Sequence, residues 1–408
     1  MDDRGQIAIV AVFRSNFFYF ILLYLIALTI TVHYALFEMQ LISDQLEEYK
    51  LYLLAIQNPT WHLFSSGEMY WSNLLNSCPM ITHVPAWFQI VFHLPAELWF
   101  KLWPCLIYSL TPAFIYLSSR RYMDIPYSIL SSGLVLCGFF FLFYPAMGRV
   151  SIAWGLLSGL IWAMASRRIA WATIFAVSLP FSHYGTSAIG ILLVSPLLVT
   201  RNIKYLIPIG TLIATFVIWD FGICEVPYQL VSNFVKSSAV IPTVLTNPLS
   251  WANNFLFYSS GLYVTENVLK PVIMLSMAVF LPRIKENFTR KSLAYAIFVL
   301  LLLITNFSQF LLLVALASGV YLAIRRFDVQ LSLLTVSGLI ITLLGLFVPY
   351  INDSYGPARC WFTAILAFAP SLALGIKTIS DYFKTPRYLI FALIILLYGV
   401  MSLNIRLL

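Results

Sequence analysis

Charged residues are scarce in this chain of 408 amino acids: they make up 10% of the sequence, against about 25% in soluble domains. Hydrophobic residues make up 61%, where soluble domains have roughly 45–50%. Uncharged apolar runs of about 20 residues recur along the chain, and a run of that length can cross a bilayer as a helix. The composition therefore indicates an integral membrane protein and excludes a free cytosolic enzyme, a disulfide scaffold and a nucleic-acid-binding protein.

The apolar runs predict an all-α fold, a polytopic bundle of about 11–14 transmembrane helices. We expect the first run to be a retained span, because it is longer than the apolar core of a signal peptide and lacks a small-residue cleavage site. The predicted spans are 16–37, 98–118, 127–147, 151–166, 169–183, 184–200, 203–222, 268–282, 292–306, 307–324, 328–349, 360–377 and 388–406.

The distribution of basic residues predicts the orientation. The net charge is +8, and Lys and Arg accumulate in the cytoplasmic loops of membrane proteins. If residues 1–15 are cytoplasmic, every second junction is cytoplasmic too. Those junctions hold most of the basic residues: Arg120/Arg121, Arg167/Arg168, Arg201/Lys204, the run from Arg283 to Lys291, Arg325/Arg326 and Lys377/Lys384/Arg387.

This register leaves two long segments on the outer, non-cytoplasmic side, 38–97 and 223–267. Neither is long enough to form a separate soluble domain, so we predict that residues 1–408 form one membrane domain with its site at the outer face. Within the first segment, 79–95 is compatible with a further crossing, a re-entrant hairpin or an interfacial helix. The predicted spans 151–166 and 169–183 are short, which is expected of tilted, broken or shielded helices.

Acidic residues gather in the first outer segment, in contrast to the basic ones: Glu38, Asp44, Glu47, Glu48, Glu68 and Glu97. If a helix begins at Asp44, then Asp44, Glu47 and Glu48 lie at positions i, i+3 and i+4 and share one face. Such a group favours a divalent cation, Mg²⁺ or Mn²⁺, or raises the pKa of one carboxyl enough for it to act as a base. The same spacing also fits a capping box, which needs no function.

Other polar and aromatic candidates lie on the same predicted side. Trp61 and His62 belong to an aromatic, turn-rich stretch that suits either a membrane-interface belt or stacking on a sugar or a polyprenyl chain. His183 and Tyr184 belong to a polar island, where His183 is either a ligand for phosphate or metal or a satisfied turn histidine. Arg359 enters a helix at its N-terminus, which suits a phosphate, although pairing with Asp353 or contact with lipid headgroups is equally compatible.

Two further observations concern isolated groups on this side. Arg149 is, with Arg359, the most isolated of the outer basic residues, and polar groups at membrane depth are often functional. The five cysteines are scattered, with Cys78, Cys224 and Cys360 on the outer side, so a disulfide is compatible with the sequence. The sequence contains no P-loop, no dinucleotide-binding fingerprint and no Cys/His spacing typical of zinc sites.

The order of these features resembles the polytopic glycosyltransferases of the GT-C class, which use lipid-phosphate sugars as donors. The resemblance rests on an outer loop that opens with Ser43-Asp44 and continues to Glu48-Tyr49, on the Pro-marked segment 79–95, and on a span that ends at 116–121. It looks closest to an archaeal group of GT-C-like membrane proteins with similar Ser-His-Tyr-Gly-Thr and Tyr-Gly-x-x-Arg elements, here 182–186 and 355–359. The resemblance covers 16–200 and is thinner afterwards.

The resemblance implies that Asp44 is catalytic or binds a divalent cation near the donor phosphate, with Glu47 or Glu48 as helper and Glu48 as second metal ligand. The adjacent Asp-Glu or Asp-x-Asp pair that is usual in the class is absent. The resemblance further implies donor-phosphate binding by Arg359, His183 and Tyr184, and contacts with the sugar or acceptor by Trp61 and His62 (both named above).

The expected function is therefore the transfer of a sugar, with inversion, from a polyprenyl-phosphate-linked donor to a glycan, lipid or protein acceptor at the outer face of the bilayer. Three alternatives stay open. The first is a transporter or flippase of a lipid-linked glycan, which requires a polar residue at membrane depth; Asp220, near the outer end of a span, is the one acidic candidate. The second is a polysaccharide polymerase or ligase, and the third is a non-catalytic subunit of a glycan-assembly complex.

Overall fold

A computed structural model describes most of the N-terminal half of the chain and two helices near its C-terminus. The described residues are 3–37, 41, 44–62, 72–136, 148–226, 321, 328–347 and 357–383. All regular elements within these ranges are helices, which confirms the predicted all-α class. The chain divides into two units, each described by itself: Met1–Val231 with Ile365–Ala367, and Ser232–Ala364 with Phe368–Leu408.

Four helical stretches of the described residues are long and apolar enough to cross a membrane: Asn16–Phe37, Ala96–Ser119, Gly148–Ala165 and Ile203–Ile223. They correspond to the predicted spans 16–37, 98–118, 151–166 and 203–222. The first belongs to α1 (Asp3–Phe37) and the third is α9 (Gly148–Ala165). The second is α5 (Ala96–Tyr108) joined to α6 (Leu110–Ser119), and the fourth is α12 (Ile203–Phe216) continued by the π-helical turn η2 (Val217–Ile223).

The other apolar helices described in the first unit are 10–17 residues long. They are α7 (Ile125–Leu136), α10 (Ile169–Ser178) and α11 (Tyr184–Val194), which is continued by the 3₁₀ helix η1 (Ser195–Thr200). Ten residues of α10 rise about 15 Å, half the thickness of the hydrocarbon core. The expectation that 169–183 is short for a full span therefore agrees with the structure, whereas the predicted span 127–147 is described only as far as Leu136.

The second unit contributes two described helices, α20 (Val329–Phe347) and α22 (Pro357–Phe383), at the predicted spans 328–349 and 360–377. They are joined by a buried hydrogen bond of 2.6 Å between the hydroxyls of Thr335 and Ser371. The predicted spans 268–282, 292–306 and 388–406, and 307–324 apart from Tyr321, lie outside the described residues, as does the predicted outer segment after Val226.

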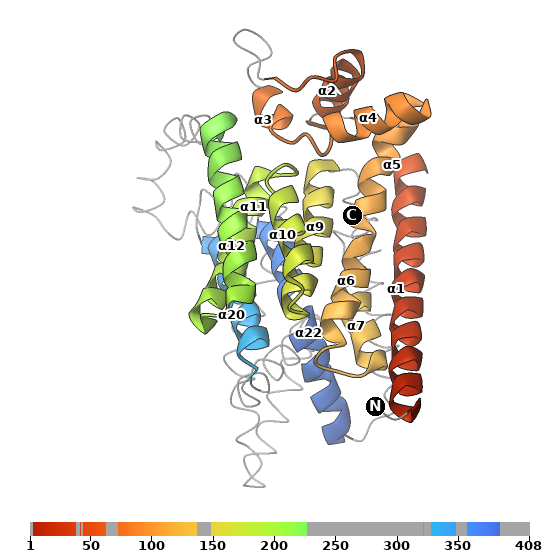
Figure 1. Ribbon diagram of the computed structural model, residues 1–408, viewed down its shortest axis with the longest axis vertical. Helices are drawn as coiled ribbons and strands as arrows, with labels where there is room; N and C mark the ends of the chain where they lie inside the picture. Colours follow the sequence, from red (N-terminus) through yellow and green to blue (C-terminus); the bar gives the residue numbers. More distant parts are fainter. Residues whose placement is uncertain are drawn as a thin grey trace, which may run out of the picture. The chain divides into compact units, whose positions relative to one another are not determined.

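Helix α9 is the central helix of the first unit. Nearly all of its residues are buried, and it packs against α5, α6, α10 and α11, while α1 packs on the outside of α5 and α6 (Figure 1). Small residues permit this close packing, as is common between transmembrane helices. A Cβ atom on Gly155 would lie 2.5 Å from the backbone oxygen of Ile107 in α5, so the two helices touch at that point.

Most acidic residues of the first unit lie at one end of the bundle and most basic residues at the other; the exceptions include Lys50, Lys101 and Arg149, which pair with acids at the acidic end. Three short helices connect α1 to α5 at one end: α2 (Asp44–Gln57), α3 (Ser72–Asn76) and α4 (His83–Phe92) (Figure 1). At the other end, Arg120 donates to Asn16 (3.0 Å), Arg121 donates to the carbonyl of Ala165, and Arg168 lies 5.3 Å from the ring of Trp162. This separation agrees with the alternation from which the topology was predicted, and the cytoplasmic side of the bundle remains a prediction.

Helix α4 bears on the alternatives for 79–95. Its ten residues rise about 15 Å, which is too short for a crossing. Its inner face buries His83, Pro85 and Ala86, and its outer face exposes five large apolar side chains: Trp87, Phe88, Ile90, Val91 and Phe92. His93 then adopts a left-handed conformation (φ 52°) and ends the helix just before α5 begins. These features fit an interfacial helix, since its apolar face is left uncovered where a predicted span starts.

We expect α4 to lie in the headgroup region of the bilayer. A nitroxide attached to Val91→Cys in vesicle-embedded protein should collide more often with oxygen than with a water-soluble nickel complex. The same label at Lys50→Cys, an exposed position of α2, should show the opposite preference. Equal accessibilities at the two positions in electron paramagnetic resonance would contradict the interfacial placement.

The close contact between α5 and α9 leads to a second prediction, which concerns the stability of the folded protein. Gly155→Ala should destabilise the folded protein by about 1–3 kcal/mol, because the added methyl group meets a backbone oxygen that cannot move aside. Gly210→Ala in α12 is the matched control, since nothing lies within 4 Å of its Cβ position and alanine favours the helix. Thermal unfolding of the purified protein measures both. An unchanged midpoint in Gly155→Ala would show that the helices are further apart than described.

Candidate functional site

A buried arginine joins two carboxylates where α9 meets α2. Arg149, the second residue of α9, places its Nη2 atom 2.7 Å from Oδ2 of Asp44 and its Nη1 atom 3.3 Å from Oε1 of Glu48. Asp44 and Glu48 are one helical turn apart on α2, so both reach the same guanidinium. The expected helix start at Asp44 is confirmed, and it is the reason that these two carboxylates face one partner.

The two carboxylates differ in exposure and so in chemistry. The side chain of Asp44 is 67% exposed, whereas that of Glu48 is 3% exposed. Burial raises the pKa of Glu48 from its ordinary value of 4.5 to about 7; the positive charge of Arg149 opposes this rise, and the negative charge of Asp44 adds to it. Asp44 is therefore the carboxylate that a ligand can reach, and Glu48 is a group that can hold a proton near neutral pH.

The pair formed by Arg149 and Glu48 leaves polar atoms unsatisfied. Within the described ranges, Oε2 of Glu48 and Nη1 of Arg149 are both buried without a hydrogen-bond partner, although Nη1 stays in ionic contact with Glu48. A buried polar atom without a partner costs on the order of 1–3 kcal/mol. A proton on Oε2 lowers this cost by removing the charge, in agreement with the raised pKa.

Gly148 allows α2 and α9 to approach this closely. A Cβ atom at this position would lie 2.7 Å from Cδ1 of Ile81 and 3.3 Å from Oε2 of Glu48. Any larger residue would have to displace Ile81 from the space next to the carboxyl. The Gly-Arg sequence at the start of α9 therefore places the guanidinium while leaving room for Glu48.

The arrangement does not fit the divalent cation that the sequence favoured. The guanidinium of Arg149 occupies the position between Asp44 and Glu48 that a shared metal ion would take, and a second cation there would be repelled. Among the residues that the structure describes, no group of three His, Cys, Asp or Glu side chains is placed to hold a metal. Glu47, the predicted helper, instead pairs with Lys50 at 2.7 Å on the exposed side of α2.

His183 caps the helix that follows it. Its Nδ1 atom accepts a hydrogen bond from the backbone N–H of Thr186 (3.0 Å) and contacts the Thr186 hydroxyl (2.9 Å). This geometry matches the satisfied turn histidine that the sequence left open, since the ring fixes the first turn of α11. Tyr184, at the start of that turn, interacts electrostatically with Arg149, so this turn borders the Asp44–Arg149–Glu48 cluster.

Arg359 lies in the second unit, in the first turn of α22. Its carbonyl accepts a hydrogen bond of 2.8 Å from the hydroxyl of Thr363, and its side chain is half-buried. Because the two units are described separately, the expected convergence of Arg359 with Asp44 and His183 stays a prediction.

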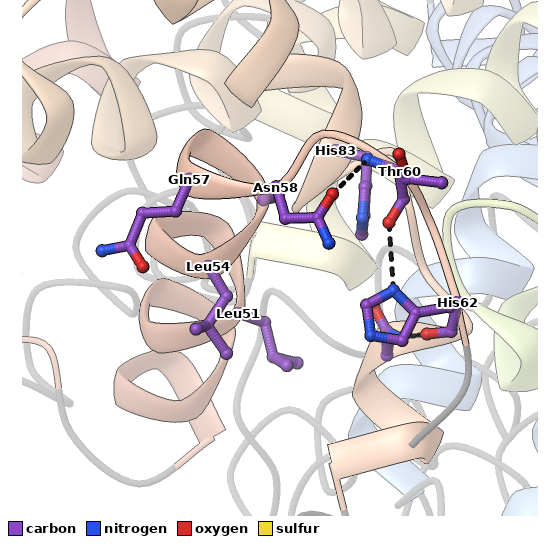
Figure 2. A pocket seen from close by; sticks show the side chains of 9 residues that line it. Leu51, Leu54, Gln57, Asn58, Thr60, His62 and His83 are labelled. Atoms are coloured by element: carbon purple, nitrogen blue, oxygen red, sulfur yellow. Dashed lines mark hydrogen bonds between the residues drawn. The ribbon is translucent and has the colours of Figure 1, made fainter. Parts of the chain in front are cut away.

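Trp61 and His62 occupy different environments. The Trp61 ring packs against Trp219, with 4.7 Å between ring centroids, and its Nε1 donates to the carbonyl of Asn76 at 2.8 Å. His62 lines a cavity of about 250 Å³, which we call the α2–α4 cavity (Figure 2). One wall of the cavity is apolar and comes from α2; the other is polar and comes from the last residue of α2, the loop after it, α3 and α4. These walls are formed by Leu51, Leu54 and Ala55, and by 57–58, Thr60, His62, Asn76 and His83.

Sequence reasoning did not place Arg149 in the site, although it had noted its isolation. The available signal was that Arg149 is the only charged residue between Asp124 and Arg167. A second such residue is Asp220, which is fully buried on the π-helical turn η2, where neither carboxyl oxygen has a hydrogen-bond partner among the residues that the structure describes. A single charge inside a long apolar stretch is costly, so it marks a position that the folded protein must accommodate.

Comparison of the sequence with known proteins does not assign the chain to a family. No protein-family model matches the chain, and no curated protein gives a significant match. The GT-C resemblance therefore rests on the short motifs given above.

The raised pKa of Glu48 can be tested by following the protonation of its carboxyl group with infrared spectroscopy as the pH is changed. Because the folded-state pKa of about 7 exceeds the ordinary value of 4.5, the folded state holds this proton more tightly, and its stability should fall as pH rises through that window. The carbonyl band of a protonated carboxyl should disappear near pH 7 and should be missing from Glu48→Gln. Glu47→Gln, which changes an exposed neighbour, should retain the band; a Glu48 carboxyl already ionised at pH 5 would refute the assignment.

Proposed function

We propose that this protein is a membrane glycosyltransferase that moves a sugar from a polyprenyl-phosphate-linked donor to an acceptor hydroxyl at the outer face of the bilayer. The observation that carries the proposal is the exposed carboxylate of Asp44, held by a buried arginine at one end of an apolar helical bundle. A polyprenyl carrier remains in the bilayer, so an enzyme that uses it needs its reactive groups next to transmembrane helices.

In the proposed reaction, Asp44 acts as general base. The acceptor oxygen attacks the anomeric carbon while its proton passes to the Asp44 carboxylate. The bond from that carbon to the phosphate oxygen breaks, and its electron pair leaves with the lipid phosphate. One displacement inverts the anomeric configuration, and the charges balance because the carboxylate negative charge is replaced by that of the phosphate.

Arg149 and Glu48 act as positioning residues in this proposal. Arg149 orients the Asp44 carboxylate through the 2.7 Å hydrogen bond, and its positive charge also favours a nearby anionic phosphate. Glu48 anchors the guanidinium from its buried side at 3.3 Å. Tyr184, which interacts electrostatically with Arg149, and Arg359 are the further proposed contacts for the donor phosphate.

Transfer of radiolabelled sugar from extracted polyprenyl-phosphate donors tests this function. Asp44→Asn should reduce the rate by about 10²–10⁴-fold, the usual contribution of a general base. Glu47→Gln is the control and should keep full activity, because its carboxylate pairs with Lys50 rather than with Arg149. Normal transfer by a folded Asp44→Asn protein would refute the catalytic assignment.

A substitution at Arg149 distinguishes two roles for this residue: orienting the Asp44 carboxylate, and supplying positive charge to the donor phosphate. Arg149→Lys keeps the positive charge but cannot contact both carboxylates through a planar fork. We expect kcat to fall in Arg149→Lys, with a smaller change in the donor KM, if the main task of Arg149 is to orient Asp44. An increase in donor KM alone would assign Arg149 to phosphate binding instead.

One observation favours a second candidate function, transport of a lipid-linked glycan. Asp220 is a fully buried acid without a hydrogen-bond partner among the described residues, and it lies on a π-helical turn, where helices often carry functional groups. Transport without transfer, abolished by Asp220→Asn and unaffected by Asp44→Asn, would support this candidate over the enzyme.

A further inference from the structure

The α2–α4 cavity is lined by polar side chains that carry no permanent charge. They are amides, one hydroxyl and two imidazoles, and none of the nine described residues around the cavity is an Asp, Glu, Lys or Arg. Such a lining does not suit a phosphate or a metal ion. It suits a neutral ligand with several hydroxyl groups, for which Leu51 and Leu54 provide an apolar surface.

His83 contributes hydrogen bonding rather than charge. Its side chain is buried in the first turn of α4, and its Nδ1 shares a hydrogen bond of 3.0 Å with the Thr82 hydroxyl. Burial, and then the nearby His62, lower the pKa of His83 to about 4, so its ring is neutral at physiological pH. A neutral imidazole at the cavity wall can donate or accept one hydrogen bond to a hydroxyl group.

The polar wall is fixed by its own hydrogen bonds. Oδ1 of Asn58 accepts from the backbone N–H of Thr60 (3.3 Å), and Nδ1 of His62 donates to the carbonyl of Thr60 (3.1 Å). The side chain of Asn76 donates to the carbonyl of His62 (2.8 Å). Figure 2 shows this hydrogen-bonded segment on one side of the cavity and the α2 leucines on the other. A wall of this kind needs little reordering when a ligand binds.

The size and position of the cavity limit the ligand further. A volume of 250 Å³ corresponds to about eight water molecules, enough for one ring-sized polar molecule. The cavity shares helix α2 with Asp44, but Leu51 lies about 10 Å further along the helix axis, given a rise of 1.5 Å per residue. A ring in the cavity is therefore displaced from the proposed base rather than in contact with it.

We infer that the α2–α4 cavity binds one neutral sugar ring of a glycan substrate, at a position beyond the ring that reacts at Asp44. This assignment rests on the proposed function for the identity of the glycan, while binding of a sugar to the cavity can be measured without any transfer. The shared chemistry is a hydroxylated ring, which can belong to the acceptor glycan or to a glycan on the lipid carrier.

The test uses saturation-transfer NMR on the full-length protein in nanodiscs, with the methyl glycosides of mannose, glucose and galactose as probes. Leu54→Trp should weaken binding by about tenfold or more, because the indole fills the cavity. Leu46→Trp is a matched control: both leucines lie on α2, they are 41% and 40% exposed, and only Leu54 lines the cavity. Both positions are exposed enough for the protein to fold with tryptophan.

Binding to the wild type and to Leu46→Trp, but not to Leu54→Trp, supports the cavity. Absence of binding to the wild type, or equal binding to both variants, overturns it. If the wild type binds sugar but transfers none from any donor, the proposed function is refuted and the assignment of the cavity as a sugar site is supported. If the wild type transfers sugar but does not bind the methyl glycosides, the proposed function is supported and the assignment of the cavity is refuted.

The steady-state kinetics of Leu54→Trp show whether the bound sugar ring belongs to the acceptor glycan or to the lipid-linked donor. A raised KM for the acceptor with unchanged kcat places the ring on the acceptor, and a raised KM for the lipid-linked donor places it on the carrier. Unchanged constants for both substrates would overturn the assignment of the cavity to a glycan substrate.

Discussion

The burial of Arg149 is the constraint on which the end of the first unit that carries α2, α3 and α4 depends. A guanidinium at the start of a central, almost fully buried helix cannot stay unpaired, because an unpaired buried charge costs several kcal/mol. Asp44 and Glu48 supply the opposite charge, and they can do so only if α2 begins at Asp44 and lies across the end of α9. The first outer segment is thus attached to the bundle by electrostatics as well as by packing.

This attachment also gives different environments to Asp44 and Glu48, which the sequence alone does not distinguish. Both pair with the same arginine, yet one is mostly open to solvent and the other is enclosed. Burial raises the pKa of the enclosed residue to about 7, so it pairs with the arginine as a carboxylate above that pH, while the open residue remains available to a ligand. The difference arises from the depth of each position on the α2 face that packs against Gly148 and Ile81.

Much of the fold could be predicted, because length and apolarity alone define a membrane span. The predicted bounds 16–37 and 203–222 agree to within one residue with two apolar stretches long enough to cross a membrane, Asn16–Phe37 and Ile203–Ile223. The shared face of Asp44 and Glu48 followed from helical periodicity. The partner of these residues could not be predicted, since Arg149 is about a hundred residues away and only packing brings it to α2. For the same reason the sequence suggested a metal ion between these carboxylates, where the structure places the side chain of Arg149.

The glycine at position 155 has a consequence for the distant outer end. Gly155 rests against the backbone of α5, and α9 is rigid between this contact and Arg149, about 9 Å along its axis. The contact therefore limits how far α9 can move along its axis toward α2. A shift of α9 by a fraction of a turn would withdraw the guanidinium from both carboxylates together, so the vertical register of one helix determines whether the cluster exists.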